Sequence, residues 1–166
     1  RLALEDLDQA ITHWNLFRPD HPEDTLKVLG LHGDPASYKK TYMNCLVLKV
    51  DNSVDALPAT PLKIYRGMPP PQGEKIYILT CSMKGGQKVH SGYVVGIDPG
   101  VLRCRLDTMK PTGKSISGLV VHAASGAPVI NTSGHLLGLL VEEKPGPKGQ
   151  SGVLMVHSVG LLLRKL

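Results

Sequence analysis

The sequence predicts an all-β fold of the sandwich or barrel kind, and three observations support this prediction. The 166 residues include 18 Gly and 13 Pro, which give frequent turns between short apolar runs. Hydrophobic residues make up 42% of the chain and charged residues 20%, so the chain can bury a core and is not disordered by composition. Aromatic residues make up only 4%, so Val, Leu and Ile must supply most of the packing.

The first half of the chain predicts one helix and two strands. Apolar residues recur at three- and four-residue steps over residues 2–14, as expected of an amphipathic helix. A loop rich in Pro, Asp and His is expected over residues 18–24, followed by strands over residues 25–31 and 45–50. Segment 57–73 is rich in proline and shows no periodic pattern, which predicts a connector between two halves.

The second half predicts a denser series of strands with explicit turns between them. Gly and Pro mark the turns, for example KGG at 84–86 and DPG at 98–100. Short apolar runs predict strands over residues 75–81, 88–97, 101–107, 117–122, 128–131, 135–142 and 152–157. Strands at such regular spacing indicate a barrel or sandwich, and the tail 158–166 predicts a short terminal helix.

One segment combines small residues with a serine. Residues 123–131 read AASGAPVIN, and GHLLGL follows at 134–139. This stretch resembles the nucleophile region of trypsin-like serine proteases, where G-x-S-G-G-P-[LV] precedes a short strand, a turn and G-x-[LV]-[LV]-G-[LIV]. In that family a tight turn presents a serine hydroxyl, and backbone N–H groups hold the oxyanion. The resemblance implies that Ser125 is the nucleophile and that Ala123 and Ser125 form the oxyanion hole.

Four further segments are similar to the HtrA (Deg) branch of that family. They are NCLVLKVD at 44–51, KIYILT at 75–80, KVHSGYVVG at 88–96 and SGVLMVHSV at 151–159. The resemblance covers about residues 44–159 and implies a trypsin-like fold of two six-stranded-type β-barrels. The N-terminal helix and a truncated first barrel are expected in residues 1–66, and the second barrel with the nucleophile turn in residues 67–166.

At two positions that take part in catalysis in the family, this chain has a different residue. Asn44 stands in the place of the aspartate that orients the catalytic histidine. An amide favours the wrong imidazole tautomer for a serine nucleophile, and in the protease where this exchange is best described turnover falls by about 10⁴. Ala123 replaces the glycine two residues before the nucleophile, so its Cβ can crowd the oxyanion hole.

His13 is the candidate general base. It precedes Asn44 by 31 residues (44 − 13), about the spacing in the family, and ITH at 11–13 is similar to the family's T-A-A-H. Only twelve residues precede His13, and the helical pattern puts it near the end of a helix. Three interpretations stay open: the first barrel is truncated, its opening hairpin comes from another chain, or His13 has no catalytic role.

These residues support three hypotheses about function. The first is a trypsin-like serine endopeptidase of weakened activity that acts on a peptide or protein through Ser125, His13 and Asn44. The second is a pseudoprotease, an inactive module of the same fold that binds a peptide or partner protein, and Asn44 argues for it. The third is an RNA or polyanion binder. It rests only on the net charge of +5, and a solvated basic surface is the simpler interpretation because the basic residues are scattered.

The resemblance also implies where substrate binds. The expected substrate-binding residues are Gly118, Leu119, Val120, Ser151 and Gly152. The segments that carry them, 117–122 and 151–156, are mostly apolar or small, which suggests an uncharged substrate side chain. No cofactor is implied, and no histidine spacing indicates zinc.

Cysteine usage and hydropathy bear on the compartment. Cys45, Cys81 and Cys104 form no Cys-x-x-Cys pair, and an odd number of cysteines favours free thiols in an intracellular setting. One disulfide with one free cysteine, as in a secreted protein, stays open as the alternative. No apolar run reaches the roughly 18 residues needed for a membrane span, so no membrane partner is expected. The chain begins at Arg1, as expected of a processed product or an excised domain. Oligomerisation stays open.

Overall fold

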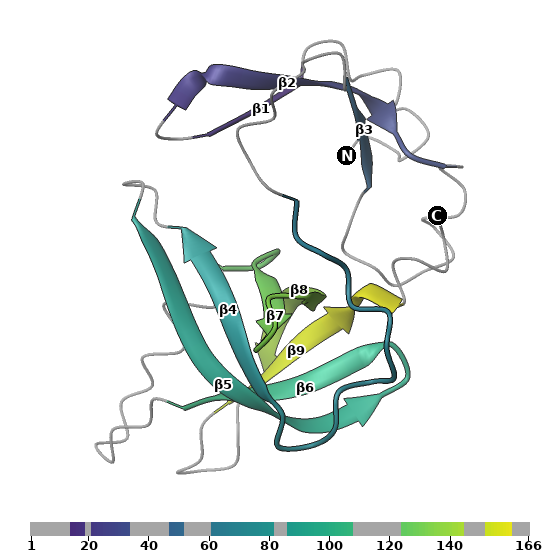
Figure 1. Cartoon of the computed structure of the whole chain (residues 1–166), viewed down its shortest axis with the longest axis vertical. Coiled ribbons are helices and arrows are strands. Elements are labelled where there is room, and N and C mark those ends of the chain that lie inside the picture. Colours follow the sequence, from purple (N-terminus) through teal and green to yellow (C-terminus); the bar gives the residue numbers. More distant parts are fainter. Residues whose placement is uncertain are drawn as a thin grey trace. The chain divides into compact units, whose positions relative to one another are not determined.

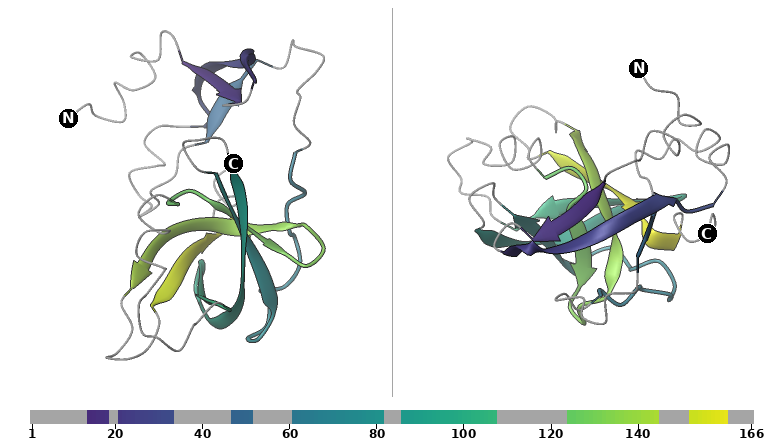
Figure 2. Two further views of the ribbon diagram at one scale, coloured as in Figure 1. Left: turned by 90° about the vertical axis from the view of Figure 1, so that its left-hand side faces the viewer. Right: turned by 90° about the horizontal axis from the view of Figure 1, so that it is seen from above.

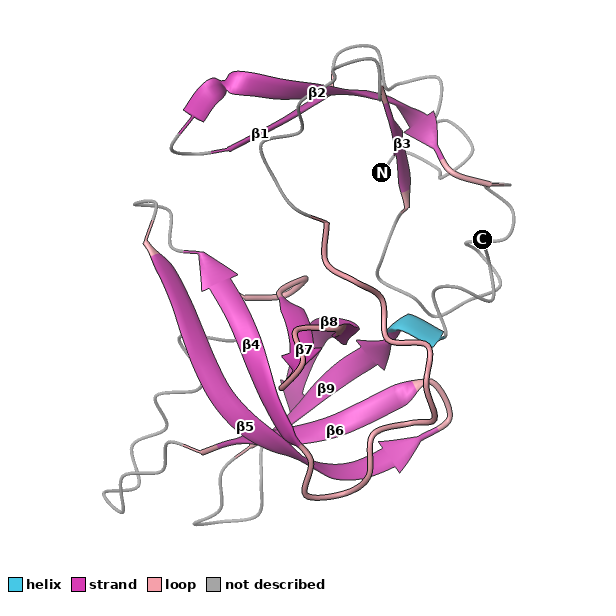
Figure 3. Cartoon of the chain, viewed as in Figure 1, coloured by secondary structure: helices cyan, strands magenta, loops and turns pink. Residues whose placement is uncertain are grey.

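The computed structural model describes residues 14–18, 21–33, 47–51, 61–81, 86–107, 124–144 and 152–160. The chain divides into two compact units, one made of residues 1–61 with 165–166 and the other of residues 62–164. Figure 1 labels the strands, and Figure 3 shows that strands make up most of the described structure. The sequence-based division into 1–66 and 67–166 stays a prediction.

The described part of the first unit is a small antiparallel sheet. Its strands are β1 (Asn15–Arg18), β2 (His21–Leu31) and β3 (Leu48–Val50), in the order β1-β2-β3. Val28 and Leu31 are buried, at 3% exposure each. Alternate residues of a strand point to opposite faces, and a one-residue shift in the β2–β3 register lets both side chains be buried.

The second unit is a closed barrel of six antiparallel strands. The strands are β4 (Lys75–Cys81), β5 (Gln87–Asp98), β6 (Val101–Leu106), β7 (Pro128–Asn131), β8 (Leu136–Lys144) and β9 (Val153–Ser158). Their order around the barrel is β4-β5-β6-β9-β8-β7, and pairing of β4 with β7 closes it. Closure leaves no edge along the paired length. Figure 2 shows the barrel from two further sides, and Figure 1 shows that β5 is bent along its length.

Aliphatic side chains fill the barrel, as the low aromatic content predicted. Ile76, Ile78, Val94, Val129 and Val156 are at most 2% exposed and belong to one cluster. They come from four of the strands, and Ile76 and Ile78 occupy alternate positions of β4, so the strand turns one face to the interior. Packing of this cluster therefore fixes the barrel strands, and the turns that connect them, relative to one another.

The strand β8 contains an irregularity at Val141. Leu140 pairs with Val156 of β9, but Glu142 pairs with Met155, so Val141 is an extra residue without a partner in this ladder. Such a β-bulge re-aims the residues around it and exchanges the two faces of the strand beyond it. The C-terminal part of β8 therefore presents different residues to the interior than simple alternation predicts.

The segment predicted as a connector, 57–73, is described from residue 61 onward and contains no strand there. Ile64 forms an isolated parallel bridge with Leu136. The Tyr65 N–H donates to the Leu136 carbonyl at 3.0 Å, and the Leu136 N–H donates to the Lys63 carbonyl at 2.7 Å. This part of the segment is thus hydrogen-bonded along the start of β8.

Most strands predicted in the second half are confirmed within one or two residues. The predicted loop over 18–24 is wrong at residue 18, which is the last residue of β1, and from residue 21 onward, where β2 begins. The strand β1 was not predicted. The predicted strand 117–122 and the helix over 2–13 lie outside the described residues, and Trp14 is not helical. Of the predicted terminal helix, Ser158 still belongs to β9, Val159 and Gly160 are helical, and the rest lies outside the described residues.

Candidate active site

Ser125 lies on a tight turn just before β7. The Ala127 N–H donates to the Ala124 carbonyl at 2.9 Å, and Gly126 between them has φ +88°. A positive φ at the third residue is the signature of a type II turn and favours glycine. Ala124 and Ala127 are buried at 6% and 9% exposure, whereas Ser125 is exposed. The small flanking residues therefore anchor the turn, and the serine hydroxyl reaches the surface.

The turn is held against the bulge in β8. The Ser125 Oγ donates to the Val141 carbonyl at 3.2 Å, and the Gly126 N–H donates to the Leu140 carbonyl at 2.7 Å. The Leu140 N–H donates in turn to the Ala127 carbonyl at 2.9 Å. Because Val141 has no partner in the β8–β9 ladder, its carbonyl can face the serine.

Of the remaining predicted site residues, only Gly152 lies in the described structure. His13, Asn44, Ala123, Gly118, Leu119, Val120 and Ser151 lie outside the described residues. Gly152 immediately precedes β9 and is half-buried. The roles of all these residues stay predictions.

Sequence reasoning passed over two residues that stand beside the predicted site. Val141 provides the carbonyl that accepts the Ser125 hydroxyl, and the side chain of Glu143 packs over the α-carbon of Gly152. A Cβ added to Gly152 would come within 2.6 Å of the Glu143 Cδ. In the sequence, the change from apolar to acidic residues at the end of β8 could have drawn attention to this region. The bulge that decides where these residues point depends on strand pairing and is not visible in the sequence.

A second turn fixes the other end of β7. The side chain of Asn131 is buried, and its Oδ1 accepts hydrogen bonds from the N–H groups of Ser133 at 3.1 Å and His135 at 2.9 Å. The Gly134 N–H donates to the Asn131 carbonyl at 3.0 Å, and Gly134 has φ +77°. The hairpin that carries the Ser125 turn is thus closed by an internal hydrogen-bond network.

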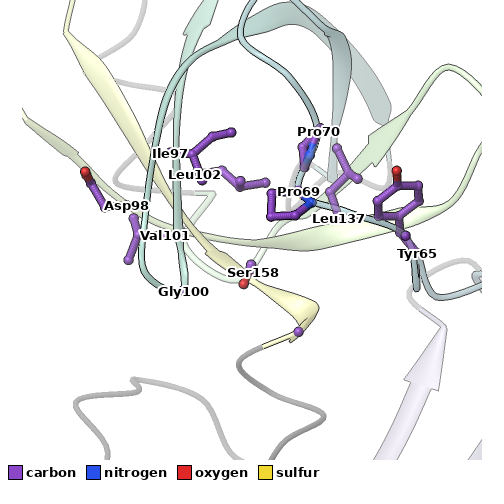
Figure 4. Close-up of a pocket in the computed structure, with 12 residues that line it drawn as sticks. Tyr65, Pro69, Pro70, Ile97, Asp98, Gly100, Val101, Leu102, Leu137 and Ser158 are labelled. Atoms are coloured by element: carbon purple, nitrogen blue, oxygen red, sulfur yellow. The ribbon is translucent and has the colours of Figure 1, made fainter.

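A pocket of about 110 Å³ occurs elsewhere in the second unit. Figure 4 shows Pro69 and Pro70 beside Leu137, with Ile97 and Leu102 completing an apolar wall. None of the predicted site residues lines this pocket. It is therefore separate from the turn that presents Ser125.

Three titratable groups in the described part of the second unit have shifted pKa values. A hydrogen bond from Lys75 lowers the pKa of the Asp107 carboxyl below its usual value, with a smaller contribution from Ser91, and the same bond raises the pKa of Lys75. Burial raises the pKa of the Cys104 thiol to about 12, so Cys104 is protonated and unreactive at neutral pH. None of the three is a candidate for proton transfer to Ser125.

Within the described ranges, no three His, Cys, Asp or Glu side chains gather closely enough to hold a metal ion. In the same part of the chain, no helix combines the length and apolar character of a membrane span.

Comparison with known proteins places the chain in a family. The sequence of residues 15–139, more than half of the chain, matches the family described as trypsin-like peptidase domain. No curated protein matches the chain.

Solved structures give the same fold. The active form of the Rv3671c protease from M. tuberculosis has a TM-score of 0.58 at 16% identity, over 93% of this chain and 62% of that chain. Its inactive form has a TM-score of 0.57 at 16% identity, over 92% of this chain and 69% of that chain. At such identities the likeness concerns the fold alone. By its sequence match and its fold, the chain belongs to the trypsin-like peptidase domain family.

Proposed function

We propose that this chain is a serine endopeptidase of weakened activity that hydrolyses peptide or protein substrates at Ser125. The observation that carries the proposal is the Ala124–Ala127 turn, which presents the Ser125 hydroxyl at the surface while its small neighbours are buried. An exposed hydroxyl on a rigid turn is what nucleophilic attack on a peptide carbonyl requires.

The proposed reaction follows from the predicted roles. The Ser125 Oγ donates to the Val141 carbonyl. Proton transfer to His13, as the predicted roles require, would need this bond to break. The Oγ then attacks the substrate carbonyl as His13 takes the proton. His13 returns this proton to the leaving amine, and water hydrolyses the acyl-enzyme by the same steps.

The oxyanion of the intermediate needs two converging N–H donors. We assign this role to Ala123 and Ser125. Among the described residues, no backbone carbonyl accepts a hydrogen bond from the Ser125 N–H, which supports its availability. The main chain of the substrate would bind as an added strand, and no cofactor takes part.

A second candidate function is a pseudoprotease that binds a peptide or partner protein without cutting it. Asn44 favours it, because an asparagine in the orienting position stabilises the wrong tautomer of the histidine. The trypsin-like fold is compatible with both candidates, so only chemistry separates them.

A fluorophosphonate probe tests the reactivity of Ser125. We expect a covalent adduct on Ser125 in the wild-type chain, with no adduct in Ser125→Ala. The matched control is Ser133→Ala, which removes an exposed serine from the neighbouring turn and should leave labelling unchanged. A folded wild type that stays unlabelled would reject the enzyme and favour the pseudoprotease.

The orienting position has its own test. We expect Asn44→Asp to raise kcat for peptide hydrolysis by up to roughly 10⁴-fold, since a carboxylate restores the productive tautomer. The measurement is turnover of a fluorogenic peptide library by both proteins. An unchanged kcat would show that Asn44 does not occupy the orienting position.

A further inference from the structure

The outer face of the barrel carries a row of three polar side chains across β4, β5 and β6, which lie side by side (Figure 1). Tyr93 on β5 pairs directly with Lys75 on one side and with Arg105 on the other. Directly paired residues share a face of the sheet, and each of the three has a core residue beside it in the chain. All three side chains therefore point away from the barrel interior.

Two neighbouring cations on this face are neutralised by acidic side chains. Lys75 binds the Asp107 carboxylate, which also accepts a hydrogen bond from Ser91. The Arg103 Nε lies 3.1 Å from a carboxylate oxygen of Asp98. Each pair is locally neutral, and its carboxylate is already engaged. The acidic groups of these two pairs are therefore not available to a further cation.

Arg105 has no such partner. Among the described residues, no acidic side chain forms an ion pair with it, and its Nε is buried without a hydrogen-bond partner. The residue as a whole is half-buried, and Nε is the only one of its three side-chain nitrogens that is both buried and unpartnered. The two Nη nitrogens thus stay accessible, while part of the charged group has lost solvation without gaining an acceptor.

A single anionic group would compensate this charge. A guanidinium holds a carboxylate with two parallel N–H donors, and such charge-assisted hydrogen bonds are roughly twice as strong as neutral ones. The two neighbouring ion pairs cancel their own charges, so Arg105 adds one unbalanced positive charge to this face. A nucleic acid needs a series of cations along its phosphates, so one carboxylate fits this face better than a polyanion does.

Tyr93 gives the same site an apolar side. Its side chain stands directly opposite Arg105 and is 37% exposed. Directly paired residues have Cβ atoms about 5 Å apart, so a ligand bound to the guanidinium also meets the tyrosine ring. Tyrosine and arginine are the residues enriched in the centres of protein interfaces. The combination favours a carboxylate that is carried by a peptide or protein, next to an apolar side chain, over a free small ion.

We propose that Arg105 and Tyr93 form a docking site for a partner peptide or protein that presents one carboxylate beside an apolar side chain. None of the predicted active-site or substrate-binding residues lies on β4, β5 or β6, so this site is separate from the Ser125 turn. The inference therefore does not rest on the proposed function, and it holds for an active protease and for a pseudoprotease alike.

Two blocked dipeptides, acetyl-Phe-Glu-amide and acetyl-Phe-Gln-amide, test the need for a carboxylate. Their Kd values would be measured on Ser125→Ala, which leaves them uncut, by NMR titration of the Tyr93 backbone amide. We expect the Glu peptide to bind at least about ten times more tightly than the Gln peptide, as is typical of a charge-assisted hydrogen bond. Equal affinity for the two peptides, or no saturable shift at Tyr93, would overturn the inference.

Variants of the two outward arginines test which cation binds. Arg105→Gln should weaken binding of the Glu peptide by roughly 10- to 100-fold. Arg103→Gln is the matched control, because that arginine already pairs with Asp98, and it should change Kd by less than about twofold. An equal loss in both variants would contradict the assignment to Arg105.

Three further ligands identify the source of the anion. Acetyl-Phe-Gln with a free C-terminal carboxylate, compared with the Glu peptide, shows whether the site prefers a chain terminus or an acidic side chain, and either preference supports the proposal. Inorganic phosphate and a uridine hexanucleotide represent the other anions. Tighter binding of either one than of the carboxylate peptides at the Tyr93 amide would reject the proposal.

Discussion

At the scale of single residues, two glycines adopt the same left-handed backbone conformation in two different turns. Gly126 in the Ser125 turn and Gly134 in the β7–β8 turn have φ of +88° and +77°. A Cβ at either would meet nothing within 4 Å, so no steric clash complicates the comparison. Replacement by an L-residue costs only the strain of a left-handed backbone, about 1–2 kcal/mol.

Gly126→Ala should therefore lower both stability and the reactivity of Ser125, because relief of the strain distorts the turn that presents the hydroxyl. Gly134→Ala should lower the free energy of unfolding by a similar 1–2 kcal/mol or so while leaving reactivity intact. Urea unfolding and fluorophosphonate labelling rates provide the two measurements. Equal labelling of both variants would contradict the role assigned to the turn.

Asp107 makes stability depend on pH. Its pKa is lowered from 3.8 by the hydrogen bond from Lys75, so it contributes stability above its usual pKa, and this contribution is lost as pH falls through the lowered value. The pKa of Lys75 is raised from 10.5, so its contribution is present below that value and is lost at more alkaline pH. Both contributions are small because both side chains are exposed.

Asp107→Asn should slightly lower Tm between about pH 5 and 9, and the difference from wild type should shrink toward pH 2 as the wild-type carboxylate is protonated. Thermal unfolding followed by circular dichroism across this range measures the effect. A difference that persists undiminished in acid would show that the side chain acts through packing and not through its charge.

At the scale of elements, the β7–β8 hairpin connects Ser125 to the strand that carries Val141 and Glu143. Its turn depends on Asn131, which is 7% exposed and accepts two backbone N–H groups through its Oδ1. A buried acceptor with two donors holds the hairpin in one register. The bulge in β8 then decides which of its acidic residues faces the interior.

Asn131→Ala should reduce the free energy of unfolding by about 1–3 kcal/mol, because it removes the acceptor of both N–H groups. Thr132→Ala, an exposed change in the same turn, should stay within about 0.5 kcal/mol of wild type. Chemical denaturation of the three proteins compares them. Similar stabilities of Asn131→Ala and Thr132→Ala would mean that the side-chain network does not hold the hairpin.

At the scale of the whole molecule, the described residues of the barrel form one core cluster of mostly aliphatic side chains. Ile76 is completely buried and lies on β4, which pairs with both β5 and β7. A cavity at this position therefore affects strands that lie far apart in the sequence. Val89 on β5 is 65% exposed and offers a matched aliphatic position outside the cluster.

Ile76→Ala should lower the free energy of unfolding by about 2–5 kcal/mol, the sum of lost transfer free energy and the cavity that remains. Val89→Ala should change it by no more than about 0.5 kcal/mol. Urea denaturation of both variants tests this contrast. A comparable loss in the two would indicate that the barrel has no specifically packed interior.

The strands of the six-stranded barrel were predictable because alternating apolar residues and turn residues are visible in short stretches of sequence. β4 and β7 were predicted at their observed limits, since each is a short β-prone run between clear turns. The strand β1 was missed because its four residues follow an apolar pattern that is typical of a helix. The start of β2 was missed because His, Pro, Glu and Asp at residues 21–24 resemble a loop by their weak strand propensity. The pairing of His21 with Arg18 of β1 is a contact that no local pattern specifies.

The sequence by itself determined the features that depend on neighbouring residues. The small residues around Ser125 specify a tight turn, because only they allow buried flanks and a positive φ at Gly126. Tertiary structure alone decided the closure of β4 onto β7 and the bulge at Val141, because both arise from pairing between distant strands. The same pairing turned Glu143, and not Glu142, to the interior side of the barrel, which no local pattern could specify.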